Sequence, residues 1–325
     1  MFNFRTGLRW SLGAAAMAVV IGCARPSMMV KTPPVTGIKY APATSDARTQ
    51  VAVIDERKNP QFMEGLLHLN PNYNGADLNP PQFLATHLAA ELNSRGLKVD
   101  SQVGNNSLPK LHLKTFKMQN SRSNGFSPFY TFTFLDADLE SASGTKRIGI
   151  FIQADKVPVW SPEEIVEPTI SQPMTIAVQE LSSKVANILF DFHASDAQVE
   201  SLIARLADAK APTRYMDTYA LGFANNPLAI DKLAVLTKDP DDYVRLAAIS
   251  SLGILHATAQ MPLLQHIYQD PQALWQERAM AIKAIGDLDT PDAKAYLGTE
   301  FKKLAAQPLN NDNRRLSQVM MLYYR

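Results

Sequence analysis

Cysteine is almost absent from this chain: its 325 residues include one, Cys23. A single thiol cannot form an internal disulfide, which excludes a fold built on a disulfide framework. An excess of one charge is also missing, because 32 lysines and arginines stand against 31 aspartates and glutamates. A net charge of +1 creates no field that would attract nucleic acid. We therefore expect neither a disulfide scaffold nor a nucleic-acid-binding protein.

The common motifs of catalytic and cofactor sites are missing too. The sequence has no P-loop, no G-x-G-x-x-G and no G-x-S-x-G, and its six histidines form no H-E-x-x-H. Asp136, Asp138 and Glu140 alternate along one strand and could hold a divalent cation, but a solvated strand face gives the same pattern. We predict no catalytic residue, no metal and no cofactor. A hydrolase with a dispersed site is the least favoured alternative.

An apolar run without charge begins at Trp10, after Arg5 and Arg9, and reads WSLGAAAMAVVIG. It is too short to cross a bilayer comfortably, which takes about 20 residues. A basic start followed by a short apolar stretch is typical of a secretory signal peptide, here residues 1–22.

The end of this run, VIGC at residues 20–23, resembles the lipobox of bacterial lipoproteins. The resemblance implies that Cys23 carries a lipid and becomes the first residue after cleavage. Ala24 stands where an aspartate would retain such a protein in the inner membrane, which implies a lipid anchor in the outer membrane, facing the periplasm. A free reactive thiol at Cys23 is the alternative.

Four prolines interrupt the next segment, at positions 26, 33, 34 and 42. Proline removes a backbone donor and breaks helices. We therefore predict a flexible tether over residues 23–48.

Residues 49–193 show the pattern of an α+β domain. QVAVIDERK reads as a strand, and PPQFLATHLAAELNSRGLKV reads as an amphipathic helix running into a second strand. Three alternating runs follow, KLHLKTF, FYTFTFLDADLES and KRIGIFIQADKVPVW, which predict an antiparallel meander. A long helix with apolar residues at helical spacing closes the domain near residue 193. We expect an antiparallel sheet covered by two helices.

This order of strand, helix and meander resembles small envelope lipoproteins of the YajG type. The resemblance implies a binding or adaptor domain without enzymatic activity. Five aromatic residues could line a site for an envelope lipid, glycan or peptidoglycan, although packing in the core is the commoner use: Phe129, Tyr130, Phe132, Phe134 and Trp160.

Residues 194–325 contain a repeat. RYMDTYALGF, RLAAISSLGI and RAMAIKAIGD each begin with arginine and have glycine in the ninth place, at Gly222, Gly253 and Gly286. The spacing of 31 and 33 residues predicts a solenoid of paired helices. The segment PDDYVRLAAISSLGIL resembles a HEAT repeat. We expect each glycine at a turn or a close-packed place, and residues from about 195 onward to fold alone.

The recurring arginines admit two interpretations. Arg214, Arg245, Arg278 and Arg315 could form a ladder for an acidic partner, or they could pair inside and between the repeats. We favour the structural interpretation, because lysines and arginines balance aspartates and glutamates over this region.

Together these features predict a non-catalytic adaptor or assembly scaffold of a periplasmic envelope complex, such as a secretion, pilus or transport machine. Its partners would be other envelope proteins, because solenoids offer extended surfaces to proteins. The alternative is a carrier that binds an envelope ligand through residues 49–193. The oligomeric state stays open.

Overall fold

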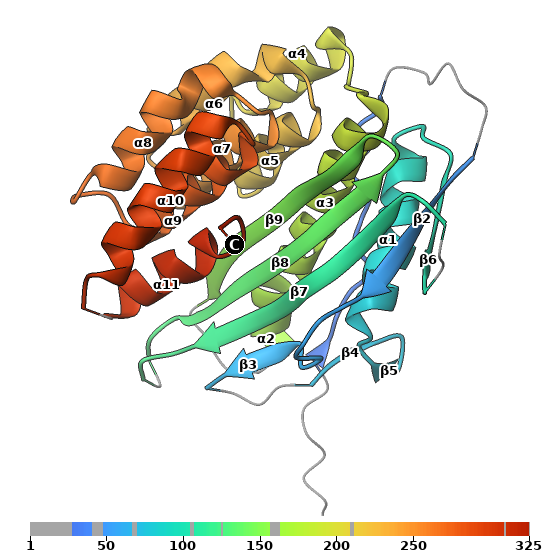
Figure 1. The fold of residues 1–325 in the computed structure, drawn as a ribbon, viewed down its shortest axis with the longest axis horizontal. Coiled ribbons are helices and arrows are strands. Elements are labelled where there is room, and N and C mark those ends of the chain that lie inside the picture. The colour runs from blue at the N-terminus through green and yellow to red at the C-terminus, as the bar shows by residue number, and fades with distance from the viewer. Residues whose placement is uncertain are drawn as a thin grey trace, which may run out of the picture.

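The computed structural model describes residues 28–40, 48–66, 70–104, 107–124, 126–156, 163–208, 211–308 and 310–324. A sheet with helices on one face lies beside a stack of paired helices (Figure 1). This is an α+β region followed by an all-helical solenoid, as predicted. Cys23, Trp160 and the predicted signal peptide lie outside the described residues.

The main sheet has the strand order β6-β2-β7-β8-β9, and the short β3 (Met63–Gly65) also pairs with β7. Strands β7 (Lys110–Ser121), β8 (Phe129–Ser141) and β9 (Gly144–Lys156) form the predicted antiparallel meander. Period-2 alternation gives this meander two faces. One faces the helices that cover the sheet, and the other faces the end of the chain (Figure 1).

The sheet is mixed, which corrects the expectation that it is antiparallel throughout. Strand β2 (Thr49–Asp55) runs parallel to both β6 (Val99–Val103) and β7. Helix α1 (Pro80–Ser94) lies between β2 and β6 in the chain and makes β2-α1-β6 a crossover unit, in which the second strand runs parallel to the first. Strand β7 starts beside Ala52, close to where β6 ends beside Val53, so a short connection suffices.

Helices α1 and α3 (Gln172–Phe190) cover one face of the sheet. Helix α1 begins where the Asn79 side chain accepts a hydrogen bond from the Gln82 backbone N–H, with prolines in its first turn. Helix α2 (Glu163–Val166) and the π-helical turn η1 (Glu167–Ser171) lead directly into α3. Most of α3 is buried around its whole circumference, because the sheet, α1 and the solenoid surround it.

The described part of the predicted tether, residues 28–40, is not free. Strand β1 (Met28–Met29) pairs with β4 (Pro71–Tyr73), which in turn pairs with β5 (Ala76–Asp77). Ile38 and Tyr40 are buried, and the Tyr40 hydroxyl donates to the carbonyl of Phe223 at 2.9 Å. Prolines exclude a helix here. The burial of apolar side chains nevertheless fixes these residues against the fold in an extended conformation.

Eight helices of the described chain form the solenoid. The inner row is α5 (Arg214–Phe223), α7 (Asp242–Ile254) and α9 (Trp275–Asp287), which pack on one another and toward α3 and β9. The outer row is α4 (Asp196–Arg205), α6 (Ile230–Leu236), α8 (Met261–Gln269) and α10 (Pro291–Ala305). Helix α11 (Asn311–Met320) ends the stack against the face of the sheet opposite α3 (Figure 1).

The repeated glycines lie inside the inner helices, so of the two expected places, a turn or a close-packed position, they occupy the second. An ideal Cβ on Gly222 would come within 2.5 Å of the Ser251 hydroxyl oxygen, and one on Gly253 within 2.5 Å of the Cα of Ala284. The glycines therefore occupy close-packed places between neighbouring repeats. The turns lie three residues later, at Asn225, His256 and Asp289, which all have positive φ angles near 50°.

One continuous hydrophobic core spans both regions. Buried side chains of the sheet, of α3 and of the inner solenoid helices belong to a single cluster. The boundary predicted near residue 193 is therefore a change of architecture within one packed body.

Candidate functional site

Arg214 and Arg245 of the predicted ladder pair within the solenoid. The Arg214 guanidinium donates to both carboxylate oxygens of Asp239, at 3.0 and 2.6 Å, and both side chains are less than a tenth exposed. The Arg245 guanidinium bonds Glu277 of the next repeat at 2.5 Å and the carbonyl oxygen of Asp239 at 2.7 Å. The contact to Glu277 links α7 to α9.

The other two arginines pack on aromatic rings. The Arg278 Nε donates to the carbonyl oxygen of Tyr268 at 2.9 Å, and its guanidinium lies 5.6 Å from the centre of that ring. The Arg315 guanidinium lies 3.6 Å from the centre of the Phe132 ring on β8 and 5.6 Å from that of Trp275. All four guanidinium groups therefore have partners inside the molecule, and Arg315 joins the solenoid to the sheet.

The alternating carboxylates of β8 face cations on neighbouring strands. Arg147 of β9 bonds Asp138 at 2.6 Å and Asp136 at 3.1 Å. Glu140 lies 3.0 Å from His112 on β7. No group of metal-ligating side chains occurs among the described residues. These carboxylates form cross-strand pairs of the usual kind.

The candidate aromatic residues do not converge on one cavity. Tyr130, Phe132 and Phe134 lie on the sheet face toward the end of the chain, whereas Phe129 lies on the opposite face by the alternation of β8. Phe132 packs against Trp275 with ring centres 5.6 Å apart. These residues contribute to the packing between sheet and solenoid.

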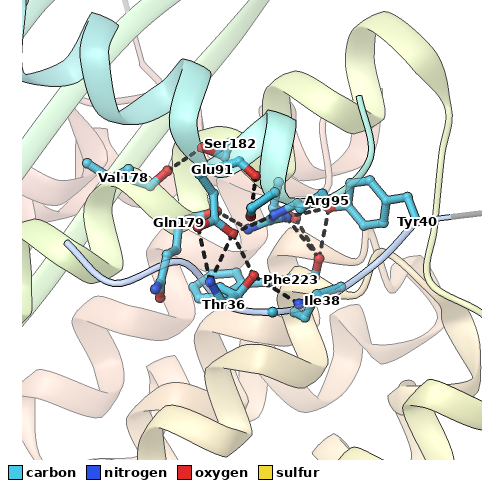
Figure 2. A network of polar contacts seen from close by, with 12 residues as sticks. Thr36, Ile38, Tyr40, Glu91, Arg95, Val178, Gln179, Ser182 and Phe223 are labelled. Carbon is cyan, nitrogen blue, oxygen red and sulfur yellow. Dashed lines mark hydrogen bonds and ion pairs between the residues drawn. The ribbon is translucent and has the colours of Figure 1, made fainter. Parts of the chain in front are cut away.

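A fully buried arginine that the sequence analysis did not single out joins four segments. Arg95, directly after α1, bonds Glu91 at 2.8 Å, the carbonyl of Gln179 on α3 at 3.0 Å and that of Phe223 on α5 at 3.2 Å. It also donates to the hydroxyl of Tyr40 from the N-terminal segment. Figure 2 shows these groups converging on the guanidinium. The i, i+4 spacing of Glu91 and Arg95 was the available sequence signal.

A second buried network connects α3 to α9. Lys283 lies 2.5 Å from Glu180, and Lys184 lies 2.6 Å from Asp287. Burial opposes charge on Lys283 and Asp287, but the opposite charges outweigh it, so the pKa of Lys283 is raised and that of Asp287 is lowered. The Tyr323 hydroxyl donates to Asp287 at 2.6 Å. The charges of two buried lysines and two buried carboxylates therefore cancel between α3 and α9.

A small cavity of about 180 Å³ lies where β9, the start of α3 and the first solenoid helices meet. Three tyrosines line it, Tyr215 and Tyr219 from α5 and Tyr243 from α7. Gln153 and Asp155 of β9 supply its polar wall. Aromatic rings and acceptor groups therefore meet in this hollow.

His87 of α1 packs in the interior. Its ring centre lies 4.4 Å from that of Phe83, and burial lowers its pKa. Among the described residues, no helix combines the length and hydropathy that a membrane span needs.

Comparison with known proteins identifies the helical region. A family model for HEAT repeats matches residues 199–276, from α4 into α9. HEAT repeats are solenoids that serve as scaffolds for protein interactions, and they are typically non-catalytic. No curated protein matches the chain.

Two solved structures resemble part of the chain. The rare lipoprotein B from Shewanella oneidensis is 13% identical over 43% of this chain and 89% of its own, with a TM-score of 0.24. A hypothetical protein from Chlamydia trachomatis is 10% identical over 43% of this chain and 97% of its own, with a TM-score of 0.25. Scores this low carry no argument about function.

Proposed function

We propose that this protein is a non-catalytic scaffold, anchored by a lipid on Cys23 to the outer membrane and facing the periplasm, where it assembles other envelope proteins. The observation that carries the scaffold role is the HEAT solenoid, whose outer helices stay open to partners. The anchor is supported by the VIGC sequence at residues 20–23.

The outer row of the solenoid is the surface that we assign to partners. The inner row packs toward α3 and β9, and the ladder arginines are engaged there. In α6, by contrast, only Leu233 and Leu236 are buried, and in α8 only Leu264 and Tyr268. Val235 of α6 has 68% of its surface exposed, an apolar group available for contact.

The anchor would hold the body close to the membrane. Cys23 and Met28, where the described fold begins, are five positions apart. A fully extended chain covers at most about 3.5 Å per residue, so this linker reaches roughly 18 Å. Met28 would therefore lie within roughly 18 Å of the membrane surface.

Substitution of Cys23 tests the anchor. Cys23→Ser removes the thiol that would carry the lipid, so we expect the protein to move from the outer-membrane fraction to the soluble periplasm. Metabolic labelling with a radioactive fatty acid should mark the original protein and leave the variant unlabelled. A Cys23→Ser protein that still fractionates with the outer membrane by itself contradicts the anchor.

A charge on the outer row tests the scaffold. Val235→Glu places a carboxylate on the proposed docking surface, and we expect it to abolish crosslinks to envelope proteins formed in intact cells. Val103→Glu is the matched control, because Val103 is also exposed, at 41%, but lies at the end of β6. Loss of the same crosslinks in both variants, or in neither, contradicts the assignment of this surface.

A further inference from the structure

The tyrosine cavity has the features of a binding site that the scaffold role does not use. Strand β9 ends at one wall, η1 supplies Pro168, and the start of α3 supplies Gln172 and Pro173. Helices α5 and α7 supply the three tyrosines. The cavity thus forms only where the sheet and the solenoid meet.

The aromatic wall is held in a fixed geometry. The Tyr215 and Tyr243 rings lie with their centres 5.8 Å apart at an angle of 50°. The Tyr215 hydroxyl donates to Gln172 at 2.8 Å, and the Tyr243 hydroxyl donates to the Asp155 carboxylate. The hydroxyls of Tyr215 and Tyr243 are thus engaged, and both rings line the cavity. Aromatic faces of this kind attract cations.

The polar wall contains one buried acceptor that lacks a donor. Gln153 is 8% exposed, and its Oε1 has no hydrogen-bond partner. An unsatisfied buried acceptor is costly and rare in folded proteins, so a ligand that donates here would be favoured. Among the described residues, no lysine, arginine or histidine forms an ion pair with Asp155.

Asp155 is the charged residue among those that line the cavity. The charge of Glu167, which pairs with Lys31 at 3.0 Å, contributes to the raised pKa of Tyr215, after the larger effect of burial. An anionic ligand would be repelled here. A neutral apolar ligand would leave Gln153 Oε1 unpaired.

The size of the cavity restricts the ligand. Sites for drug-sized ligands usually measure about 300–1,000 Å³. A cavity of about 180 Å³ holds a group the size of one amino-acid side chain. Its apolar walls, which include Ile152 and Ile176, would suit the methylene stem of such a group.

We propose that this cavity binds an organic monocation, an ammonium or guanidinium group on a short apolar stem, with Asp155 and Gln153 accepting its protons and the tyrosines packing around it. The cation comes either from a free amine or from a lysine or arginine side chain of another protein.

Titration monitored by NMR of the full soluble protein, made with Cys23→Ser, tests the proposal. The probes are n-butylamine, N-acetyl-lysine methylamide and N-acetyl-arginine methylamide, with N-acetyl-norleucine methylamide as the neutral control. We expect the cations to bind at least about tenfold more tightly than the norleucine probe. Tighter binding of the two blocked amino acids than of n-butylamine indicates a protein side chain, and the reverse indicates a free amine. Equal affinity for the neutral probe, or no binding by any cation at about 10 mM, overturns the proposal.

Two variants locate the binding. Asp155→Asn keeps the shape of the side chain and removes its charge, and we expect it to weaken binding of the cations about tenfold or more. Gln153→Met removes the unpaired acceptor at nearly the same length, so it should weaken binding several-fold without lowering the melting temperature. Asp231→Asn, on the exposed side of α6, is the matched control for charge. Unchanged affinity in Asp155→Asn, measured on protein whose melting temperature is also unchanged, overturns the assignment.

Discussion

A single methyl group at position 253 tests how closely the repeats pack. Inside a helix, alanine is normally about 1 kcal/mol more favourable than glycine. At Gly253 the new Cβ would meet the backbone of Ala284 at 2.5 Å, and overpacking of this kind costs about 1–3 kcal/mol. We therefore expect Gly253→Ala to lower the free energy of unfolding by up to about 2 kcal/mol, measured by urea denaturation.

Gly298 in α10 provides the control for this substitution. The nearest atom to its ideal Cβ is on the Tyr324 ring at 3.3 Å, a side chain that can shift. Gly298→Ala should leave the protein equally stable or more stable by up to about 1 kcal/mol. A Gly253→Ala protein that gains stability like Gly298→Ala would show that the repeats have room to separate.

His112 should make part of the stability depend on pH. Partial burial opposes its charge, but hydrogen bonds and the charges of Glu140 and Glu56 outweigh burial and raise the pKa of His112 above its ordinary value near 6.5. The stabilisation is therefore fully present below about pH 6.5 and is lost as the pH rises through the raised pKa.

The comparison of His112→Gln with the original protein isolates this effect. We expect the difference in the free energy of unfolding to be larger at pH 5.5 than at pH 9. At pH 5.5 the His112 ring of the original protein is an imidazolium between two carboxylates, and at pH 9 it is neutral. Glu56 also pairs with Lys114, and that contact is present in both proteins. A difference that is constant across this range would show that the His112 ring acts through packing alone.

At the scale of elements, Arg95 holds four segments together: residues 28–40, α1, α3 and α5. Its side chain is fully buried with that of Glu91. Removing one partner of a buried pair leaves an uncompensated charge and costs about 3–5 kcal/mol. Arg95→Met should lower the free energy of unfolding by that amount, measured by chemical denaturation.

A double variant separates the lost charge pair from lost packing. In Glu91→Gln with Arg95→Met, the amide oxygen can still accept the hydrogen bond that the Thr36 hydroxyl gives to Oε1 of Glu91. We expect this protein to recover a good part of the stability lost in Arg95→Met, because no charge remains buried alone. If the losses in the free energy of unfolding from the two substitutions simply add, the Glu91–Arg95 pair makes no specific contribution to stability.

At the scale of the whole molecule, sheet and solenoid should unfold together. They share one hydrophobic core, and the Lys283–Glu180 and Lys184–Asp287 pairs cross the boundary. Isolating residues 195–325 would remove α3 and β9 from the inner helices and leave Lys283 and Asp287 without partners on α3. We therefore expect the full chain to melt in one transition and this fragment to lack a cooperative one.

Circular dichroism and calorimetry measure both outcomes. A fragment that melts cooperatively near the temperature of the full chain would show that the solenoid is a separate domain, as the repeat pattern alone had suggested. Two separate transitions in the full chain would lead to the same conclusion.

The sequence by itself determined the features that depend on local pattern. Alternation along 129–141 and 144–156 marked the meander, and the arginine-to-glycine register marked the repeats, because side-chain periodicity follows directly from strand and helix geometry. It also led us to expect that the glycines are turn or close-packed positions, and the close-packed interpretation is correct.

Only the tertiary structure decided which surfaces meet. Arg315 reaches Phe132 across 183 positions of sequence, and Tyr40 reaches Phe223 across the same distance. The parallel pairing of β2 and the burial of residues 28–40 likewise depend on partners far along the chain. The tyrosine cavity exists because β9, α3, α5 and α7 converge there, and a pattern of period 2 or 3.6 carries no information about which distant element will lie opposite.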